Sequence, residues 1–101
     1  MITTTIDHFV SARLLLRQAN FYTARSVDII RAHPRADPLW LHLTYQNVHA
    51  PYVDPPAWEC RDFPGFWDKT FGNMLWQLDS GVGNVTDALK TTGLWDTTLL
   101  L

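Results

Sequence analysis

The histidines are the residues with the most chemical potential in this sequence, because an imidazole can accept a proton, donate a hydrogen bond or bind a metal. None of the four belongs to an H-E-x-x-H motif or a similar metal spacing. His33 follows a predicted helix, and His42 lies in a predicted strand, where we expect it to be tucked against a covering helix. His49 lies four residues beyond Tyr45, just outside the carboxyl end of that strand. Ligands bind at this end of strands in open α/β sheets, which strengthens the case for His49 as a site residue, while the alternative of a loop histidine without function stays open.

Two further residues carry potential nucleophiles, and the surroundings of both argue against that role. Cys60 is the only cysteine, so the chain can form no internal disulfide and no cysteine-based metal cage. No Cys/His constellation surrounds Cys60, and we predict an unreactive loop thiol. Ser80 lies inside a predicted helix, and Leu78 replaces the first glycine of the G-x-S-x-G nucleophile elbow. The sequence therefore predicts no serine or cysteine nucleophile.

Asn84 begins an N-x-[ST] sequon, the acceptor sequence for N-glycosylation. Such tripeptides occur often by chance, so the sequon alone is weak evidence for secretion. It lies within a predicted helix, off the apolar side of that helix. We therefore expect Asn84 to be exposed and to be a glycosylation site if the protein enters the secretory pathway.

Composition limits the kinds of protein that the chain can be. It has 101 residues, of which 47% are hydrophobic and 13% aromatic, as in one small globular unit at most. The net charge is −2 and no basic stripe runs along the sequence, so we expect no nucleic-acid partner. No stretch has the length of a membrane span. Asp7 and His8 interrupt the region where a signal peptide needs an apolar core, so we predict no signal peptide in this chain.

Periodicity and punctuation predict two helices in the first third of the chain. Residues 6–18 favour a short helix, with a cap among Thr3–Thr5. Residues 21–32 favour a second helix with Asn20 as its N-cap. His33 precedes a proline, which disfavours helical backbone, and should end this helix.

Residues 39–45 have the length and composition of a buried strand. Both faces are largely apolar or aromatic, as in the central strand of a parallel sheet that helices cover. Residues 46–66 contain several prolines and should form a long loop, and the aromatic residues in it argue against disorder. The order of helix, strand and loop favours an α/β architecture.

The clearest predicted element is a long amphipathic helix. Its apolar residues step by 4, 3, 4, 3 and 4 and form one stripe: Phe71, Leu75, Leu78, Val82, Val85 and Leu89. Gly81 and Gly83 weaken the helix and would allow another backbone to approach closely. Gly93 should stop the helix, and Thr97–Leu101 resembles the start of another strand. One strand and the start of a second cannot form a stable sheet, so the sequence predicts a portion of a larger α/β domain.

The order of these features resembles the sulfatase family, particularly its arylsulfatase B, I and J group. In that group an apolar strand leads into a His-x-Pro loop, as Pro38–Pro51 does here. The helix and turn that follow are matched by Leu78-Asp79, Val82–Thr86, Ala88–Lys90 and Thr92–Trp95. The resemblance covers residues 21–101 and implies part of an alkaline-phosphatase-like sulfatase domain, whereas residues 1–20 stay unassigned.

The resemblance implies hydrolysis of sulfate esters, either sulfated sugars or aryl sulfates. Sulfatases use a formylglycine, made from the first residue of a C/S-x-P-x-R motif, together with a calcium ion. His49 matches the family histidine that contacts the substrate sulfate, and is expected to serve in catalysis and substrate binding. Asn84 matches a glycosylated asparagine, and Asp79 an aspartate whose role we take to be structural. The family also implies a lysosomal or secreted location.

Departures from the family pattern limit what this chain can do by itself. The sequence after Cys60 is not C-x-P-x-R, and no lysine matches the sulfate-binding lysines. We therefore expect the nucleophile and every calcium ligand to lie outside this chain, which alone should be inactive. Two alternatives stay open: an inactive, truncated sulfatase-like protein, and a small helical interaction module that uses the stripe from Phe71 to Leu89.

Overall fold

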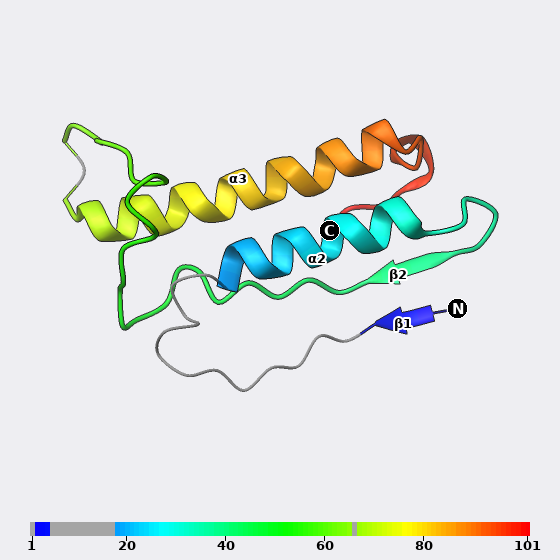
Figure 1. Cartoon of the computed structure of the whole chain (residues 1–101), viewed down its shortest axis with the longest axis horizontal. Coiled ribbons are helices and arrows are strands. Elements are labelled where there is room, and N and C mark those ends of the chain that lie inside the picture. The colour runs from blue at the N-terminus through cyan, green and yellow to red at the C-terminus, as the bar shows by residue number, and fades with distance from the viewer. Residues whose placement is uncertain (1, 5–17, 66) are drawn as a thin grey trace.

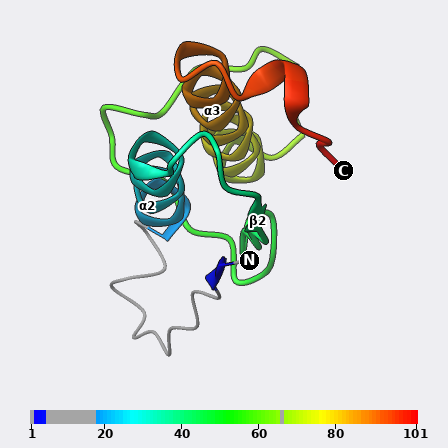
Figure 2. The same cartoon turned by 90° about the vertical axis from the view of Figure 1, so that its right-hand side faces the viewer.

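A computed structural model of the chain describes residues 2–4, 18–65 and 67–101. The elements in order are β1 (Ile2–Thr4), α2 (Gln18–Ala32), β2 (Leu39–Leu41), α3 (Lys69–Thr91) and the 3-10 helix η1 (Trp95–Thr97). Helices α2 and α3 run side by side, and the strands lie along one side of them (Figures 1 and 2). This arrangement of helices against strands agrees with the predicted α/β architecture.

The strands pair in parallel, as the sequence predicts for the segment that begins at Leu39. In the register, Ile2 is opposite Leu39 and Thr4 is opposite Leu41. Isoleucine and threonine favour extended backbone, since their branched side chains fit a pleated surface. Of the cap predicted among Thr3–Thr5, Thr3 and Thr4 lie in β1 instead, and Thr5 lies outside the described residues. The helix predicted over residues 6–18 lies outside the described residues, except for Gln18, with which α2 begins.

Helix α2 ends where the sequence predicts but begins earlier. Its last residue is Ala32, directly before His33. The ring Nε2 of His33 donates a hydrogen bond of 2.7 Å to the carbonyl of Asp37 and closes the following turn. Asn20 lies inside the helix, so the predicted N-cap is wrong. Its carboxamide donates instead to the carboxylate of Glu59.

Strand β2 is shorter than the predicted strand over residues 39–45, because its partner β1 ends opposite Leu41. Leu39, Leu41 and Leu43 nevertheless pack on the core. The alternate residues are exposed: Trp40, His42 and Thr44. The prediction that both faces are buried, with His42 tucked against a helix, is therefore wrong for the described residues. Helices α2 and α3 cover only one face of β2 (Figure 2).

Both ends of α3 are fixed by local interactions. At its start the side chain of Asp68 accepts a hydrogen bond of 3.1 Å from the backbone N–H of Phe71. At its end Gly93 has a φ of 74°, a left-handed conformation that glycine adopts readily. The N–H of Leu94 then reaches the carbonyl of Leu89 at 2.9 Å, which with the 3.1 Å bond from Gly93 to Lys90 forms a Schellman motif. The predicted glycine stop is confirmed.

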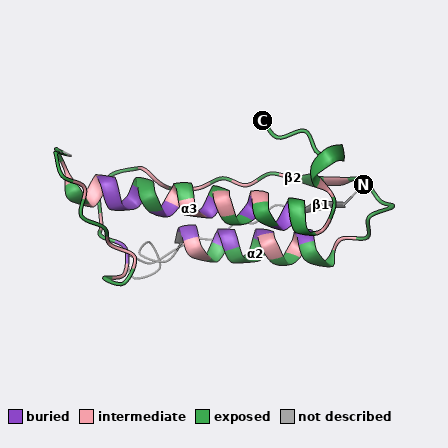
Figure 3. Cartoon of the chain, turned by 90° about the horizontal axis from the view of Figure 1, so that it is seen from above, coloured by how far each residue is buried: buried purple, intermediate pink, exposed green. Residues whose placement is uncertain are grey.

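The core lies between α2 and the C-terminal half of α3. Its buried members are Ile30, Val85, Ala88 and Leu89, and Val27, Leu39, Leu41, Leu43 and Leu94 pack around them. Val85 and Leu89 belong to the predicted stripe, which is confirmed for this half of the helix. The stripe is wrong at Leu75 and Val82, which are 42% and 44% exposed, while Met74, Gln77 and Gly81 are buried. Figure 3 shows buried positions recurring along the length of α3.

The remaining segments follow local rules. Residues 42–65, 67 and 68 contain no helix or strand, which confirms the predicted loop in its described part. The strand predicted at Thr97–Leu101 is wrong, because Trp95–Thr97 form η1 and Leu99–Leu101 are exposed coil. The hydroxyls of Thr97 and Thr98 donate to the carbonyl of Leu94, at 3.2 and 2.7 Å, and close this turn locally. Among the described helices, none has the length and apolar character needed to cross a membrane.

Candidate functional site

His49 lies in the loop beyond the carboxyl end of β2, and its side chain is exposed. Its ring Nδ1 lies 2.6 Å from the backbone carbonyl oxygen of Ala50. A carbonyl oxygen can only accept, so Nδ1 carries the hydrogen. The other ring nitrogen, Nε2, is thereby left as the atom for a ligand or for proton transfer. His49 thus lies in the loop after the strand, as predicted, but farther along it than predicted, because β2 ends at Leu41 and not at Tyr45.

The segment before His49 is attached to α3 through Asn47. The Asn47 Nδ2 donates a hydrogen bond of 2.8 Å to the backbone carbonyl of Met74 and one of 3.1 Å to the side-chain Oε1 of Gln77. A carbonyl oxygen has two lone pairs, so the Met74 carbonyl can take this bond beside its helical one. The loop is thus held two residues before His49.

The segment after His49 is attached to the start of the same helix. The ring of Tyr52 packs edge-on against the ring of Phe71, with 5.6 Å between centroids and an interplanar angle of 88°. Edge-to-face aromatic pairs of this kind are favourable beyond the area that they bury. His49 therefore lies between two attachment points, Asn47 and Tyr52, that both contact α3.

A polar network extends from Asn47 to α2. Gln77, only 6% exposed, donates from Nε2 to the Oε2 of Glu59 at 2.8 Å. The other oxygen of Glu59 accepts from the Nδ2 of Asn20 on α2. Asn20, Glu59 and Gln77 therefore join α2, the loop and α3. The sequence analysis did not predict this network. One signal for part of it was available: Asn73 and Gln77 are two amide side chains four positions apart on one helix, and therefore lie on the same side of it.

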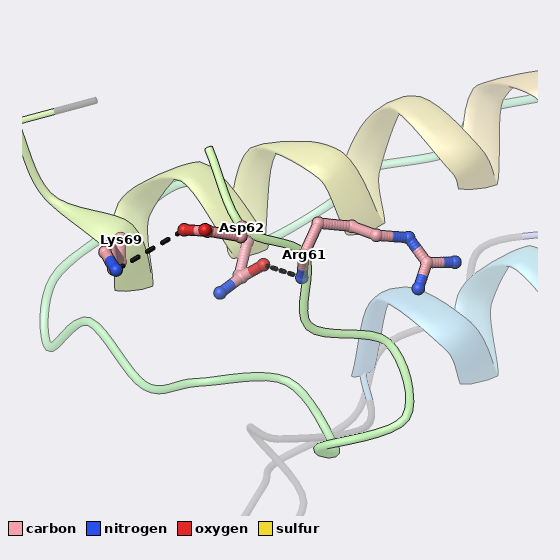
Figure 4. Close-up of polar contacts among 4 residues, drawn as sticks. Arg61, Asp62 and Lys69 are labelled. Carbon is pink, nitrogen blue, oxygen red and sulfur yellow. Dashed lines mark hydrogen bonds and ion pairs between the residues drawn. The ribbon is translucent and has the colours of Figure 1, made fainter. Parts of the chain in front are cut away.

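A second connection joins the later part of the loop to α3. The Oδ1 of Asn73 accepts a hydrogen bond of 2.7 Å from the backbone N–H of Arg61. The Nζ of Lys69 lies 3.4 Å from a carboxylate oxygen of Asp62 (Figure 4). Both side chains of that ion pair are more than 70% exposed, and exposed pairs contribute little to stability. The buried amide of Asn73 is the stronger constraint on this part of the loop.

Tyr45 precedes the His49 loop and contacts α2, whereas Asn47 and Tyr52 contact α3. Its hydroxyl lies 2.8 Å from the hydroxyl of Thr23 on α2. Burial raises the pKa of the Tyr45 phenol above its ordinary value of 10.0, and the hydrogen bond with Thr23 opposes this effect in part. Tyr45 therefore stays a neutral hydrogen-bonding group at physiological pH and fixes the start of the loop against α2.

Comparison with known proteins identifies relatives of one kind. The chain is 32% identical to mouse arylsulfatase J over 82 residues, which are 79% of this chain and 14% of that protein. It is 29% identical to an N-acetylgalactosamine-6-O-sulfatase of Bacteroides thetaiotaomicron over 83 residues, 82% of this chain and 15% of that protein. The chain belongs to the sulfatase family. No family model matches this sulfatase chain, and no solved structure matches it significantly.

Membership of the sulfatase family implies an alkaline-phosphatase-like fold. The alternative of a helical interaction module without sulfatase ancestry is wrong, because both relatives are sulfatases. The chain spans 14–15% of the length of these relatives.

The other predicted site residues of the sulfatase chain lie apart from His49. Asn84 is exposed on α3, which confirms its predicted exposure, and its glycosylation stays a prediction. Cys60 is half-buried, with its thiol donating to the carbonyl of Pro55 at 3.5 Å. Ser80 lies inside α3, as expected, and Asp79 is exposed on the same helix. None of these side chains has a hydrogen bond to the described loop residues 46–50.

A groove of about 880 Å³ runs between α2 and α3 in the sulfatase chain, and His49 does not line it. Its walls carry charges of both signs, including Asp28 and Arg31, and the indole of Trp58. The guanidinium of Arg61 lies 5.6 Å from the ring centre of Trp76 in the same groove.

The calcium ion of the sulfatase family finds no matching ligand set in the described part of this chain. Metal-binding side chains would have to gather in threes or more for such a site, and no described His, Cys, Asp or Glu residues do so. The described residues therefore do not fit a calcium site, and no chemical step is assigned to a metal here.

Proposed function

We propose that this chain is part of a sulfuric-ester hydrolase of the arylsulfatase type, in which His49 contacts the sulfate group of the substrate. The proposal rests on the placement of His49, whose exposed ring has Nδ1 engaged by Ala50 and Nε2 left available. The sulfatase names of both relatives support the reaction class.

The chemistry assigned to His49 is a charge-assisted hydrogen bond. In its protonated form, Nε2–H donates to an oxygen of the sulfate ester, and hydrogen bonds between charged groups are about twice as strong as neutral ones. As the S–O bond breaks, negative charge develops on the leaving oxygen, and the same proton can be transferred to it. General acid catalysis of this kind contributes about 100- to 10,000-fold in rate.

The remaining parts of the proposed site come from elsewhere in the protein. In this proposal, the formylglycine nucleophile and the calcium ligands come from parts of the protein outside these 101 residues. The sequence that follows Cys60 departs from C-x-P-x-R and does not supply the nucleophile. We place residues 21–101 as a portion of the alkaline-phosphatase-like domain, with residues 1–20 unassigned.

The names of the two relatives suggest the general class of the substrate. One relative is an arylsulfatase and the other a sulfatase of N-acetylgalactosamine 6-sulfate groups, as its name states. We propose a sulfated sugar or an aryl sulfate as the substrate. Glycosylation of Asn84 and a lysosomal or secreted location belong to the same proposal, since Asn84 is exposed.

The test uses the protein encoded by the complete reading frame that contains these 101 residues. The purified protein is assayed for release of 4-nitrophenol from 4-nitrophenyl sulfate, with 4-nitrophenyl phosphate as the control for ester specificity. The expected result is hydrolysis of the sulfate ester, together with a C/S-x-P-x-R motif before this segment. Stop codons on both sides of the segment, or a folded protein with that motif and no activity on sulfate esters, contradict the proposal.

A further inference from the structure

The hydrogen bonds that link the His49 loop to α2 through Gln77 have fixed donor and acceptor roles. Asn47 donates to the Oε1 of Gln77, and Gln77 donates from Nε2 to Glu59. Glu59 as a carboxylate only accepts, and its second oxygen takes the amide of Asn20. The side-chain amide of Gln77 must therefore present its oxygen to the loop and its nitrogen to Glu59. The opposite orientation would bring donor against donor at Asn47.

The position of Gln77 makes these roles consequential. Its side chain is 6% exposed, so water cannot readily replace a lost partner. Asn47 is half-buried and lies two residues before His49. A buried, doubly bonded glutamine thus holds the backbone from which His49 projects, while Tyr52 on Phe71 holds the other side of the loop.

We propose that Gln77 is a positioning residue for His49, oriented by Glu59 and acting through Asn47. This inference rests on the proposed function for its catalytic consequence, and on the hydrogen bonds alone for the ordering of the loop. Gln77 does not touch the substrate in this account. It limits the positions that the His49 ring can take, and a displacement of about 1 Å at a reacting group can cost about 100-fold in rate.

The ordering of the loop is tested on the protein from the complete reading frame by ¹⁵N relaxation of the backbone amides of residues 48–50. Gln77→Leu removes both of its hydrogen bonds, and Asn47→Ala removes the donor to Gln77 and Met74 without changing a residue of either helix. Order parameters for residues 48–50 should fall from about 0.85, the rigid range, to below about 0.6 in both variants. Gln46→Leu is the matched control, because Gln46 is exposed in the same loop, and it should change nothing.

A reversal of the two polar groups separates positioning from general damage. Gln77→Glu alone places two carboxylates opposite each other and should loosen the loop. The double variant Glu59→Gln/Gln77→Glu again matches every donor with an acceptor. Its new amide at position 59 accepts from Asn20 and donates to the new carboxylate at position 77, and that carboxylate also accepts from Asn47. The order parameters of the double variant should return to the wild-type range.

The catalytic consequence is measured on the protein from the complete reading frame. Gln77→Leu and Asn47→Ala should lower kcat by about 10- to 100-fold with a smaller change in KM, and the double variant should recover most of kcat. Unchanged order parameters in both variants, or no recovery in the double variant, overturn the proposal. Loosened loops with unchanged kcat, in a protein whose His49→Ala variant is impaired, also overturn it. If no protein in the series hydrolyses sulfate esters, the proposed function fails, while the order parameters still decide the role of Gln77 in the loop.

Discussion

The hydroxyl groups of Thr23 and Tyr45 lie 2.8 Å apart, and both are directed at the same backbone position, Gly81. Thr23 belongs to α2, Tyr45 follows β2 and Gly81 lies in α3. The absence of a side chain at Gly81 lets the hydrogen-bonded pair sit against α3. This junction joins three parts of the chain at the point where it enters the His49 loop.

Gly81→Ala should destabilise the chain. A Cβ at this position would lie 2.5 Å from the Thr23 hydroxyl and 2.8 Å from the Tyr45 hydroxyl. Thr23 is 6% exposed and has little room to move, so we expect a loss of about 1–3 kcal/mol, as for other overpacked sites. Urea unfolding followed by circular dichroism measures this change.

The matched control for this variant is Gly83→Ala in the same helix. Nothing lies within 4 Å of a Cβ at Gly83, so the helical preference of alanine should leave stability unchanged or raise it by up to about 1 kcal/mol. Equal effects of the two substitutions would show that the contact of Thr23 and Tyr45 with α3 does not form.

Stability should fall at alkaline pH because of Tyr45. Burial raises the pKa of this phenol above 10.0 in the folded chain, so the folded state holds the proton more tightly than the unfolded state. Between pH 10.0 and the folded pKa, Tyr45 ionises only in the unfolded chain, and the free energy of unfolding decreases as pH rises. The measurement is urea unfolding at about pH 8 and at about pH 11.

Two variants test whether Tyr45 causes the loss of stability at alkaline pH. Tyr45→Phe should remove the Tyr45 part of the pH dependence, at the cost of the hydrogen bond to Thr23. Tyr52→Phe should retain it, because Tyr52 is 45% exposed. An identical fall with pH in the wild-type chain and in Tyr45→Phe would contradict the assignment.

The C-terminal ends of α2 and α3 could be predicted from sequence because local residues determine them. Gly93 stops α3 through its own left-handed backbone, and His33 before a proline ends α2. The loop after Tyr45 was recognisable from its prolines. The position of His49 beyond the strand followed from the order of these elements, and the structure agrees with it.

The spacing of apolar residues predicts only part of the buried face of α3, namely Val85 and Leu89. That spacing selects Leu75 and Val82, which are exposed, and passes over Gly81 and Gln77, which are buried. Gly81 is buried because of Thr23 and Tyr45, and Gln77 because of Asn47 and Glu59. These contacts join residues 18 to 58 positions apart along the chain, so no short window of sequence contains them.

The predicted strands are wrong in segments that have no neighbouring strand to pair with among the described residues. Residues 42–45 and 97–101 have the composition of strands, yet an extended segment becomes a strand only by pairing with another. β1 pairs with Leu39–Leu41 and ends there. At the C-terminal end, Thr98 instead donates to the carbonyl of Leu94 at 2.7 Å.

His49 carries the central claim, and its substitution tests that claim most directly. The measurement is kcat for sulfate-ester hydrolysis by the protein from the complete reading frame, compared between wild type, His49→Ala and the control His42→Ala. His42 is exposed directly after β2, in the segment that leads to the loop, and its replacement should leave kcat near the wild-type value. Contact of His49 with the substrate sulfate predicts a loss of roughly 100-fold or more for His49→Ala, and an unchanged kcat in that variant would contradict this role.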